Sequence, residues 1–316
     1  MELVWDENVV RINIVGVGGG GTNAVDRMSE TRIPLVSYIS INTDDGAVKT
    51  STADVKLQIG QKTTQGRGAG ADSEKGRLSA EEDISKIEKA ITDCDMLFVV
   101  SGMGGGTGSG AAPVVARIAK ERGILTVGVV TKPFYFEGKH RMRQAEAGIE
   151  QLSKHVDSLI EIPNDNLKYA SESKLTFNNA MAIADDVLAQ TVKNIVEVIQ
   201  RTAIVNCDFA DIQSVIRDSG RMHTATGIAS GDDRTEKIIS QLLNSKLLGT
   251  SAEGADGVLL CITAPGNVSL EEVEKISSAV TERIADNGNI IFGMDFDDTM
   301  TDQIKAVLIA TFSRQD

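Results

Sequence analysis

Short apolar runs alternate with amphipathic stretches along the first half of the 316-residue chain. Each run is rich in Val, Ile and Leu, a composition typical of strands buried on both faces of a sheet. This alternation predicts a mostly parallel sheet covered by helices on both faces, as in a Rossmann-like domain. The predicted strands are 11–15, 36–41, 55–59, 96–100, 125–130 and 159–162, and predicted helices begin near 24 and cover 74–91 and 111–122.

The second half opens with a long helical pattern and then changes in character. From Leu175 to about Arg201 apolar residues recur at helical spacing, which predicts a central helix between two domains. We therefore expect an α/β domain at 1–174, a connecting helix at 175–201 and a smaller α+β domain at 202–316. Its predicted strands are 222–230, 257–263, 289–294 and 306–312, with helices at 212–218, 233–245 and 269–286.

Three glycine-rich segments follow predicted strands of the first domain, at 16–23, 66–72 and 102–110. A strand, a glycine loop and a helix start make an anion site, because free N–H groups and the helix dipole point at the ligand. Pro113 is expected in the first helical turn after the third segment. Thr107 and Ser109 add hydroxyl donors there. The three segments predict one nucleotide crevice at the carboxyl ends of the strands.

Composition narrows the class of partner. The net charge of −13 and the pI near 4.8 argue against nucleic acid, which requires a basic surface. Three widely spaced cysteines suit a reducing compartment and show no metal-ligand spacing, and because only three histidines are present we expect no zinc site. The acidic N-terminus does not resemble a signal peptide, and no apolar run is long enough to span a bilayer. We expect a soluble cytoplasmic protein.

Asp208 and Asp211 stand three residues apart at the start of a predicted helix. At that spacing both carboxylates can face one way in the first turn, where they could act together on a ligand. Carboxylates are also favoured at helix starts for capping alone. The spacing alone does not distinguish a role in acting on a ligand from helix capping.

Three segments resemble motifs of the tubulin/FtsZ family of GTPases. Residues 104–110 read GGGTGSG and resemble its GGGTG[ST]G signature, 134–141 resemble FxFEGxxR, and 206–211 resemble NxDFAD. The chain contains no GxxxxGK[ST] P-loop. The resemblance extends from about Ile12 to Phe312.

The resemblance implies a tubulin/FtsZ fold whose first domain binds GTP or GDP, with Mg²⁺ as the accompanying ion. Asp185 and Asn23 would recognise guanine, whose N1–H and amino group are donors suited to a carboxylate. Glu137 and Arg141 would hold ribose and phosphates. The nucleotide-binding residues implied in this way are Gly19, Gly20, Gly21, Thr22, Asn23, Asp44, Gly70, Ala71, Gly105, Gly106, Thr107, Gly108, Glu137, Arg141, Met181 and Asp185.

The resemblance also implies how hydrolysis occurs. Asn206, Asp208 and Asp211 would enter the nucleotide site of the next copy in a head-to-tail filament and position the attacking water. The C-terminal domain would thereby activate the GTPase, and the protein would form the cytoskeletal ring that divides the cell. We expect the chain itself as partner, with division regulators and membrane tethers binding a C-terminal tail beyond Asp316, and neither nucleic acid nor direct membrane insertion.

Two positions depart from the family pattern. Met181 stands where an aromatic residue usually covers the base, and Asp72 stands where the family has asparagine in GAGANP. An acidic side chain near a triphosphate would repel it unless it points to solvent or to the metal.

Alternative functions remain open. One is a GTP-binding structural paralogue that assembles without hydrolysis. Another is an NAD-dependent oxidoreductase that uses 16–21 for the pyrophosphate and Asp44 for the ribose, although it leaves the third glycine segment without a role. Residues 295–299 also match DxDxT of dehalogenase-type phosphatases, but the residues needed downstream do not fit, and we expect an acidic turn there.

Overall fold

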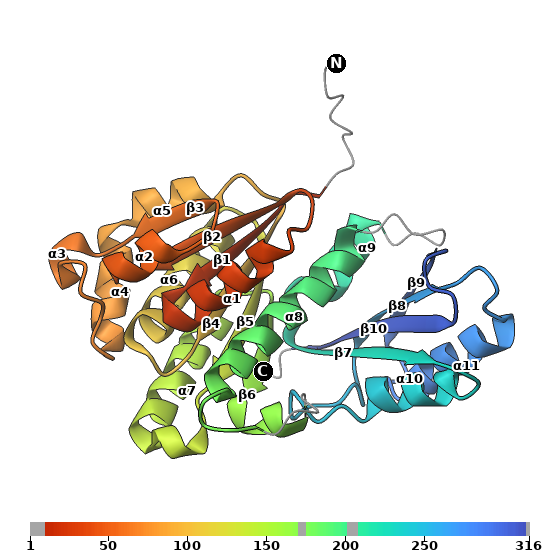
Figure 1. The fold of residues 1–316 in the computed structure, drawn as a ribbon. Coiled ribbons are helices and arrows are strands. Elements are labelled where there is room, and N and C mark those ends of the chain that lie inside the picture. The colour runs from red at the N-terminus through yellow and green to blue at the C-terminus, as the bar shows by residue number, and fades with distance from the viewer. Residues whose placement is uncertain (1–9, 170–174, 201–207, 314–316) are drawn as a thin grey trace.

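The computed structural model describes residues 10–169, 175–200 and 208–313. Six parallel strands form the first half of the sheet in the order β3-β2-β1-β4-β5-β6, which confirms the predicted Rossmann-like α/β class (Figure 1). The central strands are buried from end to end, as their apolar composition predicts. The strands are β1 Ile12–Val17, β2 Val36–Asn42, β3 Val55–Gln58, β4 Met96–Gly102, β5 Leu125–Lys132 and β6 Ser158–Pro163.

Helices cover both faces of this half of the sheet. On one face α1 (Gly18–Glu30) packs beside α8, and on the other α6 (Gly106–Glu121) packs against β4 and α7 (Lys139–Ser153) against β5. The remaining helices of the first half are α2 Asp45–Thr50, α3 Gln61–Thr64, α4 Ser73–Glu82 and α5 Ile84–Ile91, and the 3₁₀ turns are η1 Tyr135–Glu137 and η2 Asn164–Tyr169.

The sheet continues into the second half of the chain through β7 (Gly220–Ser230). β6 and β7 pair through only two residue pairs, Ser158 with Gly220 and Leu159 with Arg221, which we call the β6–β7 seam. Beyond it the order is β7-β10-β8-β9, so one ten-stranded sheet spans both halves. These strands are β8 Gly257–Ala264, β9 Asn289–Phe296 and β10 Gln303–Phe312, and the helices are α9 Phe209–Ile216, α10 Arg234–Leu243 and α11 Leu270–Thr281.

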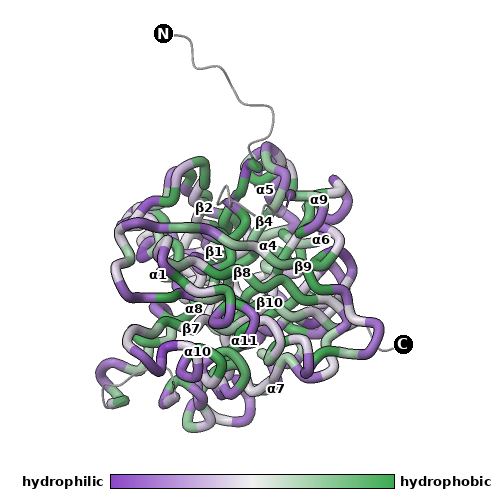
Figure 2. Tube along the Cα trace, turned by 90° about the vertical axis from the view of Figure 1, so that its right-hand side faces the viewer, coloured by the Kyte–Doolittle hydropathy of each residue, from purple (hydrophilic) through white to green (hydrophobic). Residues whose placement is uncertain are grey.

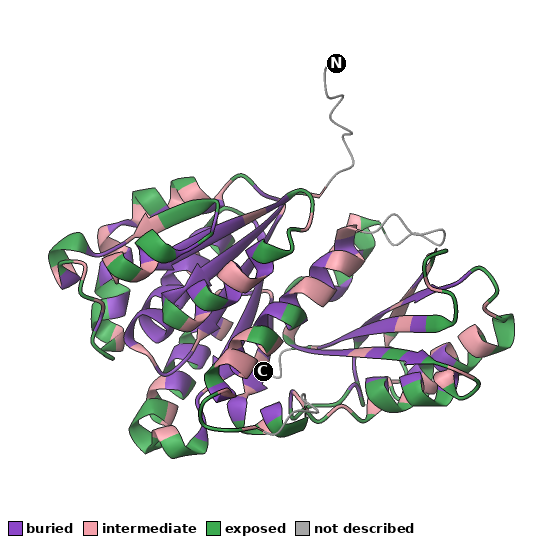
Figure 3. Ribbon diagram, viewed as in Figure 1, coloured by how far each residue is buried: buried purple, intermediate pink, exposed green. Residues whose placement is uncertain are grey.

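The central helix α8 (Ala180–Gln200) runs between the two halves of the molecule (Figure 1). Its apolar stripe is buried in a core shared with α1, β4, β5 and β10, and Leu188, Val192 and Ile195 are almost inaccessible to solvent. Figure 3 shows this contrast between the buried faces and the exposed outer turns of the helices, and Figure 2 shows apolar residues gathered inside the molecule. Apolar burial at the periodic positions stabilises the helix, as its pattern predicts.

Helix starts differ from the prediction in four places, one of which is α9, which begins at Phe209 rather than at Ile212. α1 begins at Gly18 and α6 at Gly106, inside the glycine segments, while α8 begins at Ala180, after its predicted start. Pro113 therefore lies about two turns inside α6, and its expected place in the first turn was wrong. The predicted helix 74–91 is broken at Asp83 into α4 and α5. Glycine has low helix propensity, so tertiary packing decides these starts.

The acidic turn after β9 binds its own backbone. Asp297 Oδ1 accepts hydrogen bonds from the amide N–H and the hydroxyl of Thr299, at 3.0 and 2.6 Å. This is an Asx-type turn, which explains the DxDxT spacing without phosphatase chemistry.

Candidate nucleotide site

A cavity of about 400 Å³ lies at the carboxyl ends of β4 and β5, between the N-terminal ends of α1, α6 and α8. This is the edge at which doubly wound sheets bind their ligands. We call it the candidate nucleotide cavity. Its lining residues are Gly19, Gly20, Asn23, Ala69, Gly70, Ala71, Gly102, Met103, Gly105, Gly106, Thr107, Gly108, Thr131, Pro133, Glu137, Arg141, Asn164, Met181, Ala184 and Asp185.

The glycines of the three segments serve two different purposes. A Cβ added at Gly19, Gly70 or Gly105 would meet no atom within 4 Å, so these backbones border open space and a ligand can approach them closely. At Gly108 a Cβ would lie 2.4 Å from the carbonyl oxygen of Gly102, and at Gly21 it would lie 2.3 Å from that of Val100. Those two glycines permit close packing of helix on strand.

Side chains next to the glycine-rich loop hold it in shape. Ser109 Oγ accepts a hydrogen bond from the Gly104 amide at 2.8 Å, so this hydroxyl is used by the loop itself. The hydroxyls of Thr43 and Thr107 lie 2.6 Å apart and join the second strand's loop to α6. Gln144 of α7 donates to the carbonyl of Ala71 at 3.0 Å and to that of Gly105 at 3.2 Å. The amide groups at the two loops are therefore fixed before any ligand binds.

A carboxylate and two amides meet at the α8 side of the cavity. Asn23 Nδ2 donates to Asp185 Oδ2 at 3.1 Å, although the two residues are 162 positions apart. Burial raises the pKa of Asp185 to about 6, against the opposing effects of Asn23 and Arg27. Asn164 is 5% exposed, and its Oδ1 has no hydrogen-bond partner among the described residues. Because buried amide oxygens are normally hydrogen-bonded, this unpartnered oxygen in a residue of the cavity wall is a candidate contact for a ligand.

Met181 lies one helical turn before Asp185 and lines the same end of the cavity. Its side chain is 46% exposed, and a flexible thioether can cover an aromatic ring by dispersion.

Glu137 and Arg141 form an ion pair at 2.9 Å and both line the cavity. They are four residues apart but belong to different elements, because Gly138 at φ +96° separates η1 from α7. Glu137 also accepts from the Phe134 amide at 2.8 Å, so its carboxylate is largely buried while the Arg141 side chain is half exposed. The guanidinium is thus anchored at one end and free to contact an anion at the other.

Three of the predicted nucleotide-binding residues do not line the cavity. Gly21 packs α1 against β4, and the hydroxyl of Thr22 lies 3.0 Å from that of Ser40 in the buried layer beneath the loop. Asp44 caps α2 by accepting from the Ala47 amide at 2.9 Å. Gly102 and Met103, in the third predicted glycine segment, do line it, and so do four residues that sequence reasoning missed: Thr131, Pro133, Asn164 and Ala184. Only their places at strand or helix ends could have suggested them.

Asp72, the acidic departure in the second loop, is the N-cap of α4. Its carboxylate accepts from the amides of Glu74 at 3.0 Å and Lys75 at 3.3 Å. Two amides and the helix dipole compensate its charge, which makes it less repulsive to a neighbouring phosphate.

The predicted catalytic acids lie far from the cavity of the same chain. Asp208 caps α9 and accepts from the Asp211 amide at 2.8 Å, and both residues are exposed. Asn206 lies outside the described residues. The cavity is at the N-terminal end of α8, and α9 lies beside the C-terminal end of α8 (Figure 1). The 21 residues of α8 extend about 30 Å, so this length separates the two. Within the part of the chain that the structure describes, capping is the interaction that Asp208 makes.

Among the described residues, no group of three or more His, Cys, Asp or Glu side chains is placed to hold a metal ion. Mg²⁺ commonly binds through substrate phosphates and water with one or two carboxylates, rather than in a cage of protein ligands. An ion that arrives bound to the phosphates of a nucleotide would need no preformed cage of protein ligands.

Comparisons with known proteins match both halves of the chain. Residues 11–172 match the family model described as "Tubulin/FtsZ family, GTPase domain", and residues 220–313 match "FtsZ family, C-terminal domain". The chain is also 46% identical over 311 residues to a cell division protein FtsZ of Buchnera aphidicola subsp. Schizaphis graminum, covering 98% of this chain and 81% of that relative. The chain belongs to the FtsZ family of tubulin-like GTPases.

Solved FtsZ structures support the same assignment. An empty FtsZ dimer from M. jannaschii is 38% identical, with a TM-score of 0.88 over 96% of this chain and 88% of that one. CetZ2 from Haloferax volcanii shares the fold at 19% identity, with a TM-score of 0.80 over 97% of this chain and 94% of that one. Another cell division protein FtsZ, from Buchnera aphidicola subsp. Baizongia pistaciae, is 44% identical over 98% of this chain and 81% of that relative.

Membership of the FtsZ family implies which nucleotides are bound and which reaction is catalysed. Members of a GTPase family bind GTP and GDP and hydrolyse GTP, and the curated relatives are cell division proteins. The matches give no support to an NAD-dependent oxidoreductase. Among the described helices, none has the length and apolarity needed to cross a bilayer.

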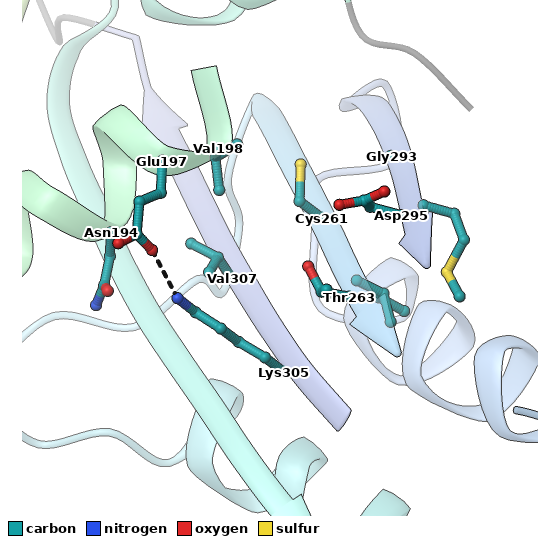
Figure 4. A pocket seen from close by; sticks show the side chains of 11 residues that line it. Asn194, Glu197, Val198, Cys261, Thr263, Gly293, Asp295, Lys305 and Val307 are labelled. Atoms are coloured by element: carbon teal, nitrogen blue, oxygen red, sulfur yellow. Dashed lines mark hydrogen bonds and ion pairs between the residues drawn. The ribbon is translucent and has the colours of Figure 1, made fainter. Parts of the chain in front are cut away.

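A second, much smaller cavity of about 30 Å³ lies between α8 and the C-terminal sheet. Figure 4 shows Glu197 of α8 directed at Lys305 of β10, and their ion pair measures 2.8 Å. Both side chains are mostly buried, so this contact joins the central helix to the second half of the sheet.

Proposed function

We propose that this chain is a self-assembling GTPase whose active site is completed by a second copy of itself. The observation that supports this most is the separation of two half-sites along α8. The candidate nucleotide cavity lies at one end, and the exposed pair Asp208 and Asp211 lies beside the other, about 30 Å away. One chain cannot bring these acids to its own nucleotide without a large rearrangement, whereas a head-to-tail neighbour can.

Guanine selectivity would come from the α8 end of the cavity. The ionised Asp185 carboxylate would accept hydrogen bonds from N1–H and the exocyclic amine, and adenine lacks N1–H. The Asn23 amide orients this carboxylate at 3.1 Å, and the unpartnered Asn164 Oδ1 is a further acceptor. Met181 would cover the ring face.

The phosphates would bind the three glycine-bearing loops. The proposed contacts are backbone amides at Gly19, Gly20, Gly70, Ala71, Gly105, Gly106 and Gly108 with the Thr107 hydroxyl, while Arg141 would reach phosphate from its anchor on Glu137. Gly21, Thr22 and Asp44 would act by holding these loops in place. Mg²⁺, bound mainly through phosphate oxygens, would neutralise charge that develops on the γ-phosphate.

Asp208 and Asp211 of the neighbouring copy would position the attacking water. Phosphoryl transfer depends on an oriented nucleophile and on charge compensation, so two carboxylates at the γ-phosphate suffice to hold and polarise a water. Asp208 is already fixed by its cap contact with the Asp211 amide. Asn206, in the same segment, would add an amide to this set.

A contact between one end of the chain and the opposite end of the next does not close on itself, so it extends into filaments. The solved FtsZ relative from M. jannaschii is described as a dimer, which supports self-association in this family. We propose that such filaments form the division ring at mid-cell in the cytoplasm, and that regulators and membrane tethers bind a tail beyond Asp316.

The test is the GTPase rate per subunit measured against protein concentration, with ATP and NAD as competing ligands. A shared site predicts a rate near zero below a critical concentration and a rise above it, with no competition from ATP or NAD. A rate per subunit that is constant at every dilution would contradict the proposal. Filaments that form with GTP but release no phosphate would instead support the structural paralogue.

A further inference from the structure

A cavity of about 600 Å³ lies beside the β6–β7 seam, where the two halves of the sheet meet. Its walls come from both matched domains. Lys132 and Glu161 belong to β5 and β6, whereas Arg221, Glu253 and Phe312 belong to the second domain. We call it the seam cavity, and it is separate from the candidate nucleotide cavity.

The strand register shows which side chains share the floor of this cavity. Leu159 of β6 is paired with Arg221 of β7, and Arg221 is in turn paired with Phe312 of β10. Residues paired across neighbouring strands point to the same face of a sheet, so these three side chains lie side by side. Leu159 and Leu248 are almost fully buried and give the cavity an apolar floor and wall.

The charges around this floor are only partly compensated. Lys132 and Glu161 form an ion pair with each other. Arg221 and Glu253 are exposed, and within residues 10–169, 175–200 and 208–313 neither has an ion-pair partner. Among the described residues, the cavity thus offers one cation and one anion that no ion pair occupies and that can bind opposite charges on a ligand.

We propose that the seam cavity binds a small zwitterion with an apolar middle, such as an ω-amino acid. The ligand's carboxylate would bind the Arg221 guanidinium, its ammonium group would bind Glu253, and its methylene chain would lie over Leu159 and Leu248. The volume lies within the range of small-molecule sites. This site goes beyond the proposed GTPase function and does not depend on it.

Such a ligand would touch both domains where the two halves of the sheet meet. The halves of the sheet are joined by only two residue pairs at this point, so a ligand that contacts Arg221 and Glu253 on one side and Leu159 on the other bridges them. Pro163, the last residue of β6, lines the seam cavity and Asn164, the first residue of η2, lines the candidate nucleotide cavity, so the β6–η2 junction borders both.

The test uses 6-aminohexanoate as the probe and the methyl NMR signals of Leu159 as the readout, in the full chain saturated with GDP. We expect a saturable shift with a Kd of roughly millimolar, because a ligand with so few atoms binds weakly. Arg221→Gln and Glu253→Gln should each weaken binding at least several-fold. Arg143→Gln, an exposed arginine of α7 that does not line the cavity, is the matched control and should bind as the wild type does.

Hexanoate and hexylamine separate the zwitterion from simpler ligands. Each lacks one of the two charges, and we expect each to bind markedly more weakly than 6-aminohexanoate. Equal binding of hexanoate, equal binding of hexylamine, or no saturable shift of Leu159 would overturn the proposal. GDP affinity measured on the same samples reports separately on the nucleotide site.

Discussion

At Asp185, burial and guanine binding favour opposite protonation states of the carboxylate. Burial raises its pKa to about 6, while guanine binding requires the ionised form. The affinity for GDP should therefore fall as the pH falls through this value, by about tenfold between pH 7 and pH 5 from this group alone. Isothermal titration of GDP across this range measures the effect.

Asp185→Asn is the control for this pH dependence. The variant should bind GDP weakly at pH 7 and lose the contribution of the carboxylate, whereas protonation of the phosphates affects both proteins alike. The ratio of the two affinities should shrink on acidification. A ratio that stays constant from pH 7 to pH 5 would show that Asp185 is not the titrating group at the base.

Single residues of the site were predictable only where a motif surrounds them. Asn23 and Asp185 were matched by resemblance, and the structure brings them within 3.1 Å although 162 positions separate them. Asn164 carries no such signal, because its importance lies in a buried amide oxygen without a partner, which only three-dimensional packing reveals. Conversely, Gly21 and Thr22 stand inside a motif but lie beneath the cavity.

At the scale of elements, close packing fixes where the helices begin. α6 starts at Gly106 because neighbouring chain leaves no room for side chains: a Cβ at Gly110 would lie 2.0 Å from the carbonyl oxygen of Ser73. Propensity alone placed the start at Ala111, since glycine disfavours helices. The strands agree closely with their apolar runs, because burial on both faces leaves little ambiguity.

Two substitutions at Asp72 separate its capping of α4 from its negative charge. Asp72→Ala removes the acceptor for the Glu74 and Lys75 amides and should lower the free energy of unfolding by about 1 kcal/mol. Asp72→Asn retains a good capping side chain and removes the charge, so stability should change little. Urea unfolding of the three proteins measures this.

GTP binding by the same two variants tests the charge itself. Because two amides compensate the Asp72 carboxylate, Asp72→Asn should change the affinity for GTP by less than about threefold. A much larger gain in affinity with unchanged stability would mean that the carboxylate repels the triphosphate after all.

At the scale of the whole molecule, the order of helices and strands could largely be predicted from the sequence. The joining of the two halves into one sheet could not. Alternating runs predict the parallel half, and the long periodic stretch predicts α8. The two-residue β6–β7 seam that makes one continuous sheet has no local sequence signal, since pairing between residues 62 positions apart depends on tertiary geometry.

The second half of the molecule should be sensitive to acid through His223. This residue is 1% exposed, its Nδ1 lies 2.9 Å from the Thr250 hydroxyl, and burial lowers its pKa to about 4. The unfolded chain, with a pKa near 6.5, binds the proton more tightly, so stability falls as the pH drops from 6.5 towards 4. Between pH 7 and pH 5 the loss from this group is about 2 kcal/mol.

Comparison with His223→Gln isolates this contribution. Asp185 acts in the opposite direction, because its raised pKa favours the folded state as the pH falls, and it is retained in both proteins. Urea unfolding at pH 7 and pH 5 should show a larger acid-induced loss for the wild type than for the variant. Equal losses would mean that His223 titrates alike in the folded and unfolded states.

The central claim, that each active site is shared by two copies, is tested most directly by mixing two inactive variants. Asp185→Ala should bind GTP poorly but keep its Asp211, whereas Asp211→Ala should bind GTP but lack the acid. Each alone should hydrolyse GTP very slowly. The mixture should regain activity, because Asp211 of one copy meets the nucleotide of the other. A mixture no faster than the sum of its parts would contradict the shared site.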